Sequence, residues 1–79
     1  GGLFDIQVSV KNNSPYNLDE VVVQVDYYLS SEKVFKTELL TFTHIAPEST
    51  STKEAPKSSR GVRIEYKIRS IQSKEYGDD

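Results

Sequence analysis

The residues EVVVQVDYYL, from Glu20 to Leu29, decide the fold class of this chain. Every odd-numbered position in the stretch is apolar, and these positions are Val21, Val23, Val25, Tyr27 and Leu29. A repeat of two places such side chains on one face of an extended strand, and β-branched and aromatic residues favour strands. We therefore expect a central β-strand whose odd-numbered side chains face the core. Its even-numbered face, from Val22 to Tyr28, is either a partner-binding surface or the inner face of a second sheet; a sandwich needs two inner faces, which favours the second.

The segments on either side of this strand also alternate. Residues 4–11 carry apolar side chains at even positions and end at Asn12-Asn13-Ser14-Pro15, whose proline has no N–H to offer a ladder. Residues 34–45 alternate less regularly, with apolar side chains on both parities. Because Leu39 and Leu40 are adjacent, we expect a bulge or a change of register there.

Two more strands are expected after residue 48. Residues 49–55 are polar and rich in threonine, which indicates a strand at the edge of a sheet. In residues 62–72 we expect one parity to face inward and the other outward: Val62, Ile64, Tyr66 and Ile68 inward, Arg63, Glu65, Lys67 and Arg69 outward. Ile71 falls on the outward parity, so a bulge or a strand end is expected near Ser70. Five strands at hairpin spacing without a helix predict an all-β fold, a small antiparallel β-sandwich.

Composition limits the chain to one small domain. Its 79 residues, 35% of them apolar, support a single thin core. There is no cysteine, and no apolar run of the ~20 residues that cross a membrane as a helix. The formal net charge of −2 favours neither nucleic acid nor a membrane surface as a partner. We expect residues 1–2 to be a cloning remnant on an excised piece, residues 3–73 to form the sandwich domain and residues 74–79 to form a flexible tail.

The order of these elements resembles the FxLYD-like and related immunoglobulin-like domains of bacterial envelope proteins. The resemblance covers residues 4–72 and rests on VKNNSPYNLDEVVVQVDYY, on the hairpin after it and on HIAPEST. The residues in the family's characteristic places are Asn13, Leu18, Val21, Val23, Val25, Tyr27, Tyr28 and Pro47. The closing APKSSRGVRIEYKIRSI looks like the end of C-terminal modules in membrane-anchored proteins of Gram-negative bacteria, whereas Leu29-Ser30-Ser31 departs from the family's Asp-Gly hairpin. The resemblance implies an immunoglobulin-like sandwich that serves as an accessory, non-enzymatic module in the periplasm or cell envelope.

Few residues offer catalytic or metal-binding chemistry. His44 is the only histidine and no nucleophile accompanies it, so a hydrogen-bonded or solvent-facing histidine at a strand end is favoured over a general base. The pairs Asp19-Glu20 and Asp78-Asp79 lack the spacing of a calcium loop and are interpreted as solvated charges. Asn12-Asn13-Ser14 fits a glycosylation sequon, to which we give little weight. We expect no catalytic residue, no metal site and no cofactor.

The candidate interaction residues are Tyr28, Arg63, Lys67 and Arg69. Residues 57–69 hold five basic residues and one acidic residue, and alternation places Arg63, Lys67 and Arg69 on one face. A solvated face on which Lys and Arg guard a sheet edge is the simpler interpretation. Nucleic-acid binding by a sheet would need exposed aromatic side chains on that face, and Tyr66 has the opposite parity and is expected to be buried. We therefore expect no nucleic-acid partner.

Two functions agree with these observations. The first is a non-catalytic accessory module of a larger, membrane-anchored envelope protein, which contacts other domains of its parent or a protein partner by strand addition at the polar edge 49–55. The second is a carbohydrate- or polyanion-binding module that targets a larger protein, with salt-sensitive binding through Arg63 and Arg69.

Overall fold

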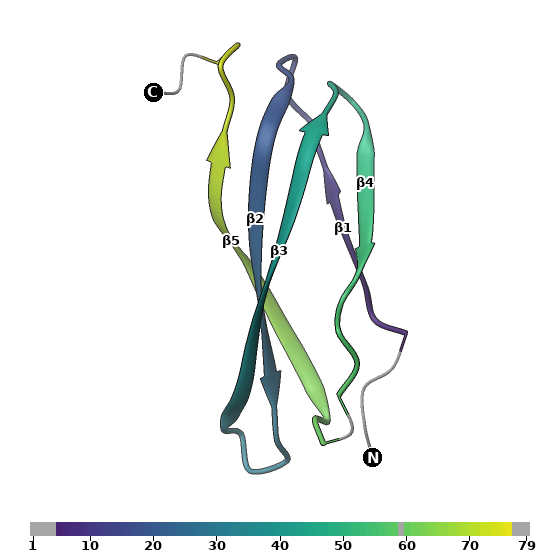
Figure 1. The fold of residues 1–79 in the computed structure, drawn as a ribbon, viewed down its shortest axis with the longest axis vertical. Helices are drawn as coiled ribbons and strands as arrows, with labels where there is room; N and C mark the ends of the chain where they lie inside the picture. The colour runs from purple at the N-terminus through teal and green to yellow at the C-terminus, as the bar shows by residue number, and fades with distance from the viewer. Residues whose placement is uncertain (1–4, 59, 77–79) are drawn as a thin grey trace.

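The computed structural model describes residues 5–58 and 60–76 as five antiparallel strands in two sheets, with no helix in those ranges (Figure 1). The strands are β1 (Gln7–Lys11), β2 (Leu18–Tyr28), β3 (Val34–Ile45), β4 (Thr50–Glu54) and β5 (Arg63–Gln72). β1 pairs with β4, whereas β2 is the centre of a three-stranded sheet and pairs with both β3 and β5. The predicted all-β, antiparallel architecture is thus confirmed.

The core lies between the two sheets and is built on the odd-numbered face of β2. Val21, Val25 and Tyr27 are completely buried, as predicted from their period of two. The same cluster includes Val8 of β1, Phe42 of β3 and Ala55, the residue just after β4. Burying an aliphatic or aromatic side chain of this size contributes about 1.5–3 kcal/mol, so this small cluster is the main source of stability.

Tyr27 combines burial with a polar contact. Its hydroxyl donates to the carbonyl oxygen of Pro56 at 2.6 Å, which ties β2 to the segment that follows β4. Burial, with a smaller contribution from the charge of Glu38, raises the pKa of the Tyr27 hydroxyl. The ring packs edge-on against Phe35, so the end of the core nearest the β2–β3 turn is closed by aromatic side chains.

The irregularity predicted at Leu39 and Leu40 is wrong. The β2–β3 register runs without a shift through these residues, and Leu39 is simply exposed, with 58% of its surface accessible, on the outer face. The departures from alternation lie at the two ends of β3 instead. The register shifts next to Tyr28, and His44 has a φ of 54° that breaks the alternation and turns Ile45 into the core.

The bulge predicted near Ser70 is confirmed. The β2–β5 register shifts between Val22, which faces Ser70, and Val23, which faces Ile68, so Arg69 is the extra residue. The shift brings Ile71 opposite Val21 and therefore onto the inner face of the sheet. Apolar side chains consequently continue along the inner side of β5 to its C-terminal end.

Two expectations about which side chains are buried are wrong. The even-numbered face of β2 does not pack on a second sheet; its residues from Val22 to Tyr28 are half-buried on the outer side of the three-stranded sheet. Of the four side chains expected inside, only Ile64 is partly buried; Tyr66 and Ile68 of β5 are exposed, and so is Val62, which lies just before β5. The reason is the unequal number of strands: a two-stranded sheet covers two strands of a three-stranded sheet. In Figure 1, β5 diverges from the β1–β4 pair towards its arrowhead.

The two ends of the chain were predicted to lie outside the sandwich domain. Residues 1–2 and 77–79 lie outside the described residues, as does residue 4, where the first strand was expected to begin. Residues 74–76, the start of the predicted tail, form a turn after β5. The ring of Tyr76 packs edge-on against Tyr16, with 5.3 Å between the ring centroids.

Candidate functional site

The four predicted interaction residues share the outer face of the three-stranded sheet. Tyr28 pairs with Arg63 and Gln24 pairs with Lys67 across the β2–β5 ladder, and the guanidinium of Arg69 donates to Gln24 Oε1 at 2.6 Å. The guanidinium of Arg63 stacks over the Tyr28 ring, 4.0 Å from its centroid. The structure thus places Arg63, Lys67 and Arg69 on one face, as their alternation indicated, and adds Tyr28 to that face. A role for these residues in binding stays a prediction.

The charge of Arg63 is locally compensated. Its guanidinium bonds to Glu32, at 2.6 Å, and to Glu65. These two hydrogen bonds, and the two negative charges, raise the pKa of Arg63. Desolvation, followed by the neighbouring charge and hydrogen bond of Glu65, raises the pKa of the Tyr28 hydroxyl. Because carboxylates are interspersed with the cations, this face has no dense positive patch, and the polyanion-binding alternative receives little support.

The polar strand β4 lies at an edge, as the sequence predicted. It pairs only with β1 among the described residues, and its side chains are exposed apart from a half-buried Ser51. The Ser9 and Thr52 hydroxyls hydrogen-bond to each other across the pair at 2.7 Å. Among the described residues, the outer edge of β4 is unpaired, and β3, beneath it, is the last strand of the other sheet. A strand added at that edge would therefore have no described strand below it.

His44 and Asn12 have structural positions. His44 is exposed at the end of β3, as expected for a strand-end histidine. The sequon residue Asn12 is 1% exposed, and its amide nitrogen donates to the carbonyl oxygens of Tyr16 (2.7 Å) and Ile45 (3.0 Å). Glycosylation of Asn12 is therefore incompatible with this fold. Within residues 5–58 and 60–76, no group of three or more metal-ligating side chains is placed to hold an ion.

The most distinctive surface is one that the sequence did not predict. The inner side of β5 exposes Tyr66, Ile68 and Ile71, with 63%, 56% and 47% of their surfaces accessible. Tyr66 and Ile68 line a groove of about 360 Å³ between β5 and β1, together with Val23 of β2 and residues 8–11 of β1. We call this hollow the β1–β5 groove.

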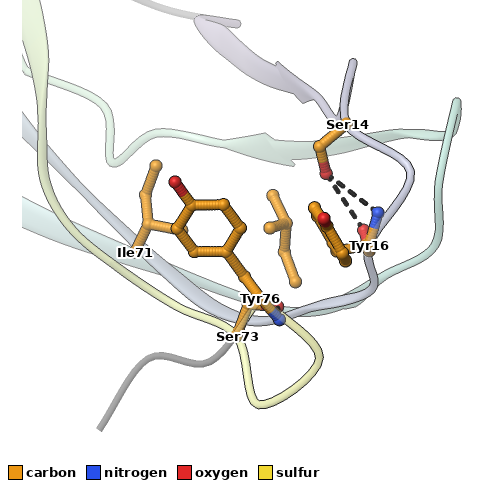
Figure 2. Close-up of a pocket in the computed structure, with 6 residues that line it drawn as sticks. Ser14, Tyr16, Ile71, Ser73 and Tyr76 are labelled. Atoms are coloured by element: carbon orange, nitrogen blue, oxygen red, sulfur yellow. Dashed lines mark hydrogen bonds between the residues drawn. The ribbon is translucent and has the colours of Figure 1, made fainter.

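An apolar pocket lies at one end of the molecule. A third hollow, which Asn12 and Asn13 also line, shares Lys11 with the β1–β5 groove and shares Ser14, Leu18 and Ile71 with this pocket. The pocket has a volume of about 300 Å³, and Figure 2 shows Tyr16, Ile71 and Tyr76 around it. Ser14 holds one wall, since its hydroxyl oxygen accepts a hydrogen bond from the N–H of Tyr16 at 3.2 Å. The exposed apolar side chains of β5 thus line the groove at Tyr66 and Ile68 and the pocket at Ile71, on the side that the β1–β4 pair leaves uncovered.

Comparisons with protein-family models, with curated proteins and with solved structures find no match. The family resemblance drawn from the residues therefore stays a prediction. In the part of the chain that the structure describes, no helix is long and apolar enough to cross a membrane.

Proposed function

We propose that this chain is an immunoglobulin-like, non-catalytic module that makes protein–protein contacts for a larger, membrane-anchored protein of the bacterial envelope. The observation that carries the contact role is the stripe of exposed apolar side chains formed by Tyr66, Ile68 and Ile71. Single exposed apolar residues are ordinary, whereas a contiguous apolar surface on a soluble domain marks a site that binds another molecule.

Two further points support the class of protein. Two antiparallel sheets enclose one core, and the chain passes between them after β1, after β3 and after β4, which agrees with an immunoglobulin-like arrangement. The residues that resemble the FxLYD-like domains, among them Leu18, Tyr27 and Pro47, supply the link to the envelope. A module of this kind would bring partner contact to a parent whose other domains carry the activity.

Whether the chain is part of a larger, membrane-anchored protein is tested by immunoblotting fractionated source cells with an antibody against this domain. We expect a band well above the 8.9 kDa of the chain, in the membrane fraction. A cytoplasmic band of the size of the chain alone would refute the accessory-module proposal.

The contact role is tested by placing a photo-crosslinking amino acid at Ile68 in the intact parent. The matched control is the same substitution at Leu39, an aliphatic residue of the same sheet with nearly equal exposure on the opposite face. We expect a discrete protein adduct from Ile68 and none from Leu39. Equal or absent crosslinking from both positions would show that the apolar stripe is not the contact surface.

A further inference from the structure

One edge of β1 has backbone groups that no described strand occupies. The amide of Ala55 donates to the carbonyl of Ile6, and the amide of Asn12 donates to the carbonyl of Ser49. Hydrogen-bonded and non-hydrogen-bonded pairs alternate along an antiparallel ladder, so the even-numbered residues of β1 bond to β4. The N–H and C=O groups of the odd-numbered residues, Gln7, Ser9 and Lys11, therefore point the other way, towards the β1–β5 groove.

The side chains beneath that edge are apolar and correctly spaced for a strand. Tyr66 and Ile68 lie two residues apart on the inner face of β5, and the bulge at Arg69 restores Ile71 to the same face. The path from residue 66 to residue 71 is about 17 Å long at the rise of a β-strand. A segment of about five residues placed beside β1 would lie over this path, as β1 and β4 lie over the other two strands of the sheet.

We propose that the β1–β5 groove binds an extended segment of a partner protein, which pairs with the free edge of β1 and sets alternate apolar side chains on Tyr66, Ile68 and Ile71. This inference rests on the proposed contact role and specifies its site and its ligand. It places strand addition on β1 and not on the polar edge of β4, because, of these two edges, only that of β1 has an apolar surface of described residues beneath it.

The occupant has to bring apolar side chains that are not already packed. A second copy of this chain could offer its own β1 edge, but Val8 of that strand is 2% exposed and already belongs to the core. Two lysines, Lys11 on β1 and Lys67 on β5, stand at the edges of the groove with their side chains on the outer faces of the two sheets, and no acidic residue of the described chain lines it. Two copies would bring these lysines together, whereas a partner segment with acidic residues next to its apolar ones would be attracted.

The test uses a defined probe, a capped synthetic peptide of nine residues with Val or Ile at alternate positions, Thr between them and Glu at both ends. Amide hydrogen exchange of the 79-residue chain is followed by NMR with and without the peptide. We expect new protection at Gln7, Ser9 and Lys11 and no change at Thr50, Thr52 and Glu54, whose N–H groups point to the outer edge of β4. New protection at Thr52 in place of Ser9 would move the site to β4 and overturn the inference.

Two pairs of variants separate the side-chain and backbone contributions. Ile68→Ser is expected to weaken peptide binding about tenfold, because it removes apolar surface that the peptide would bury. Leu39→Ser, its counterpart on the outer face, should leave binding unchanged. Ser9→Pro removes a donor from the groove edge and should abolish binding, while Thr52→Pro removes a donor from the opposite edge and should not. Both proline variants lose the same Ser9–Thr52 hydroxyl bond, so any general loss of stability is matched.

The remaining outcomes identify other occupants. Protection at Ser9 without peptide that grows with protein concentration would assign the groove to a second copy, and protection independent of concentration would assign it to the chain itself; either result overturns the inference. A control peptide with the same composition but consecutive apolar residues should bind at least about tenfold more weakly, because it can set only half as many apolar side chains on the groove. If the peptide fails while crosslinking from Ile68 persists, the strand-addition inference is wrong and the contact role stands.

Discussion

Replacing Asn12 by alanine should destabilise the domain more than any other polar substitution in its loops. The Asn12 side chain makes four hydrogen bonds: its amide donates to the carbonyl oxygens of Tyr16 and Ile45, and its Oδ1 accepts from the N–H and hydroxyl of Ser14. Its backbone N–H and C=O also bond to the β3–β4 turn at Ser49 and Glu48. Asn12 thus joins the loop after β1 to the end of β3.

The magnitude follows from what each partner loses. The Ser14 hydroxyl, released from Asn12 Oδ1, can donate instead to the Tyr16 carbonyl, 3.2 Å away. The Ser14 groups also lie near the surface, so these losses cost about 0.5–1.5 kcal/mol. The bond to the Ile45 carbonyl is buried, and leaving that acceptor unsatisfied costs about 1–3 kcal/mol. We expect a total of about 3 kcal/mol, which in a domain of this size lowers the melting temperature by about 12–24 °C.

The assay is urea denaturation followed by circular dichroism, with Asn13→Ala as the control. Asn13 is the exposed neighbour in the same loop, and its replacement should change the free energy of unfolding by less than about 0.5 kcal/mol. Asn12→Asp should cost more than Asn12→Ala, because a carboxylate oxygen would then face two carbonyl oxygens. If Asn12→Ala and Asn13→Ala unfold at the same urea concentration, the hydrogen-bond argument is refuted.

Three further predictions test the core, the outer face and the charge pattern. Val23→Asp places an unpaired charge in the core beside Val21 and Val25 and should unfold the domain. Lys67→Ala, the control, should change the free energy of unfolding by less than about 0.5 kcal/mol. If circular dichroism shows that the Val23→Asp protein is folded, the inward parity of β2 is wrong. Glu65→Gln should lower the pKa of Tyr28 towards the ordinary value of about 10, because the charge of Glu65 helps to raise it; an unchanged titration of tyrosine absorbance would contradict this contact. Binding to a heparin resin should be equally weak for the natural chain and for Arg63→Ala with Arg69→Ala, since carboxylates accompany these cations; strong, salt-sensitive binding that the double variant loses would restore the polyanion alternative.

The local structure could be predicted from the sequence because its causes are local. The strand expected at residues 34–45 has those bounds, and the other predicted strands agree with β1, β2, β4 and β5 to within a few residues. A period of two and the turn residues between the strands are sufficient for this. The bulge near Ser70 could also be predicted, because Ile71 breaks the alternation of an otherwise regular strand.

The burial of the β5 side chains could not be predicted, because it depends on how many strands of the other sheet lie opposite. Tyr66 has the sequence context of a core residue, yet it is exposed because no described strand lies opposite that part of β5. The importance of Asn12 over Asn13 was hidden for a similar reason. Both are loop asparagines in the sequence, and only the position of the Ile45 carbonyl, 33 residues away in the chain, distinguishes them.

The same imbalance of strands explains why this surface stays available in a monomer. An open edge above apolar side chains is a general risk for edge-to-edge aggregation, and natural proteins guard such edges with lysine. Lys11 and Lys67 border the groove on β1 and β5, so a second copy meets like charge there. The two lysines therefore discriminate between partners, because their charges repel another copy and attract a segment with acidic residues. Replacing both lysines by glutamate should therefore reverse the preference, so that a Lys-flanked version of the peptide binds better than the Glu-flanked one. Equal binding of the two peptides to both proteins would show that the lysines play no part in selecting the partner.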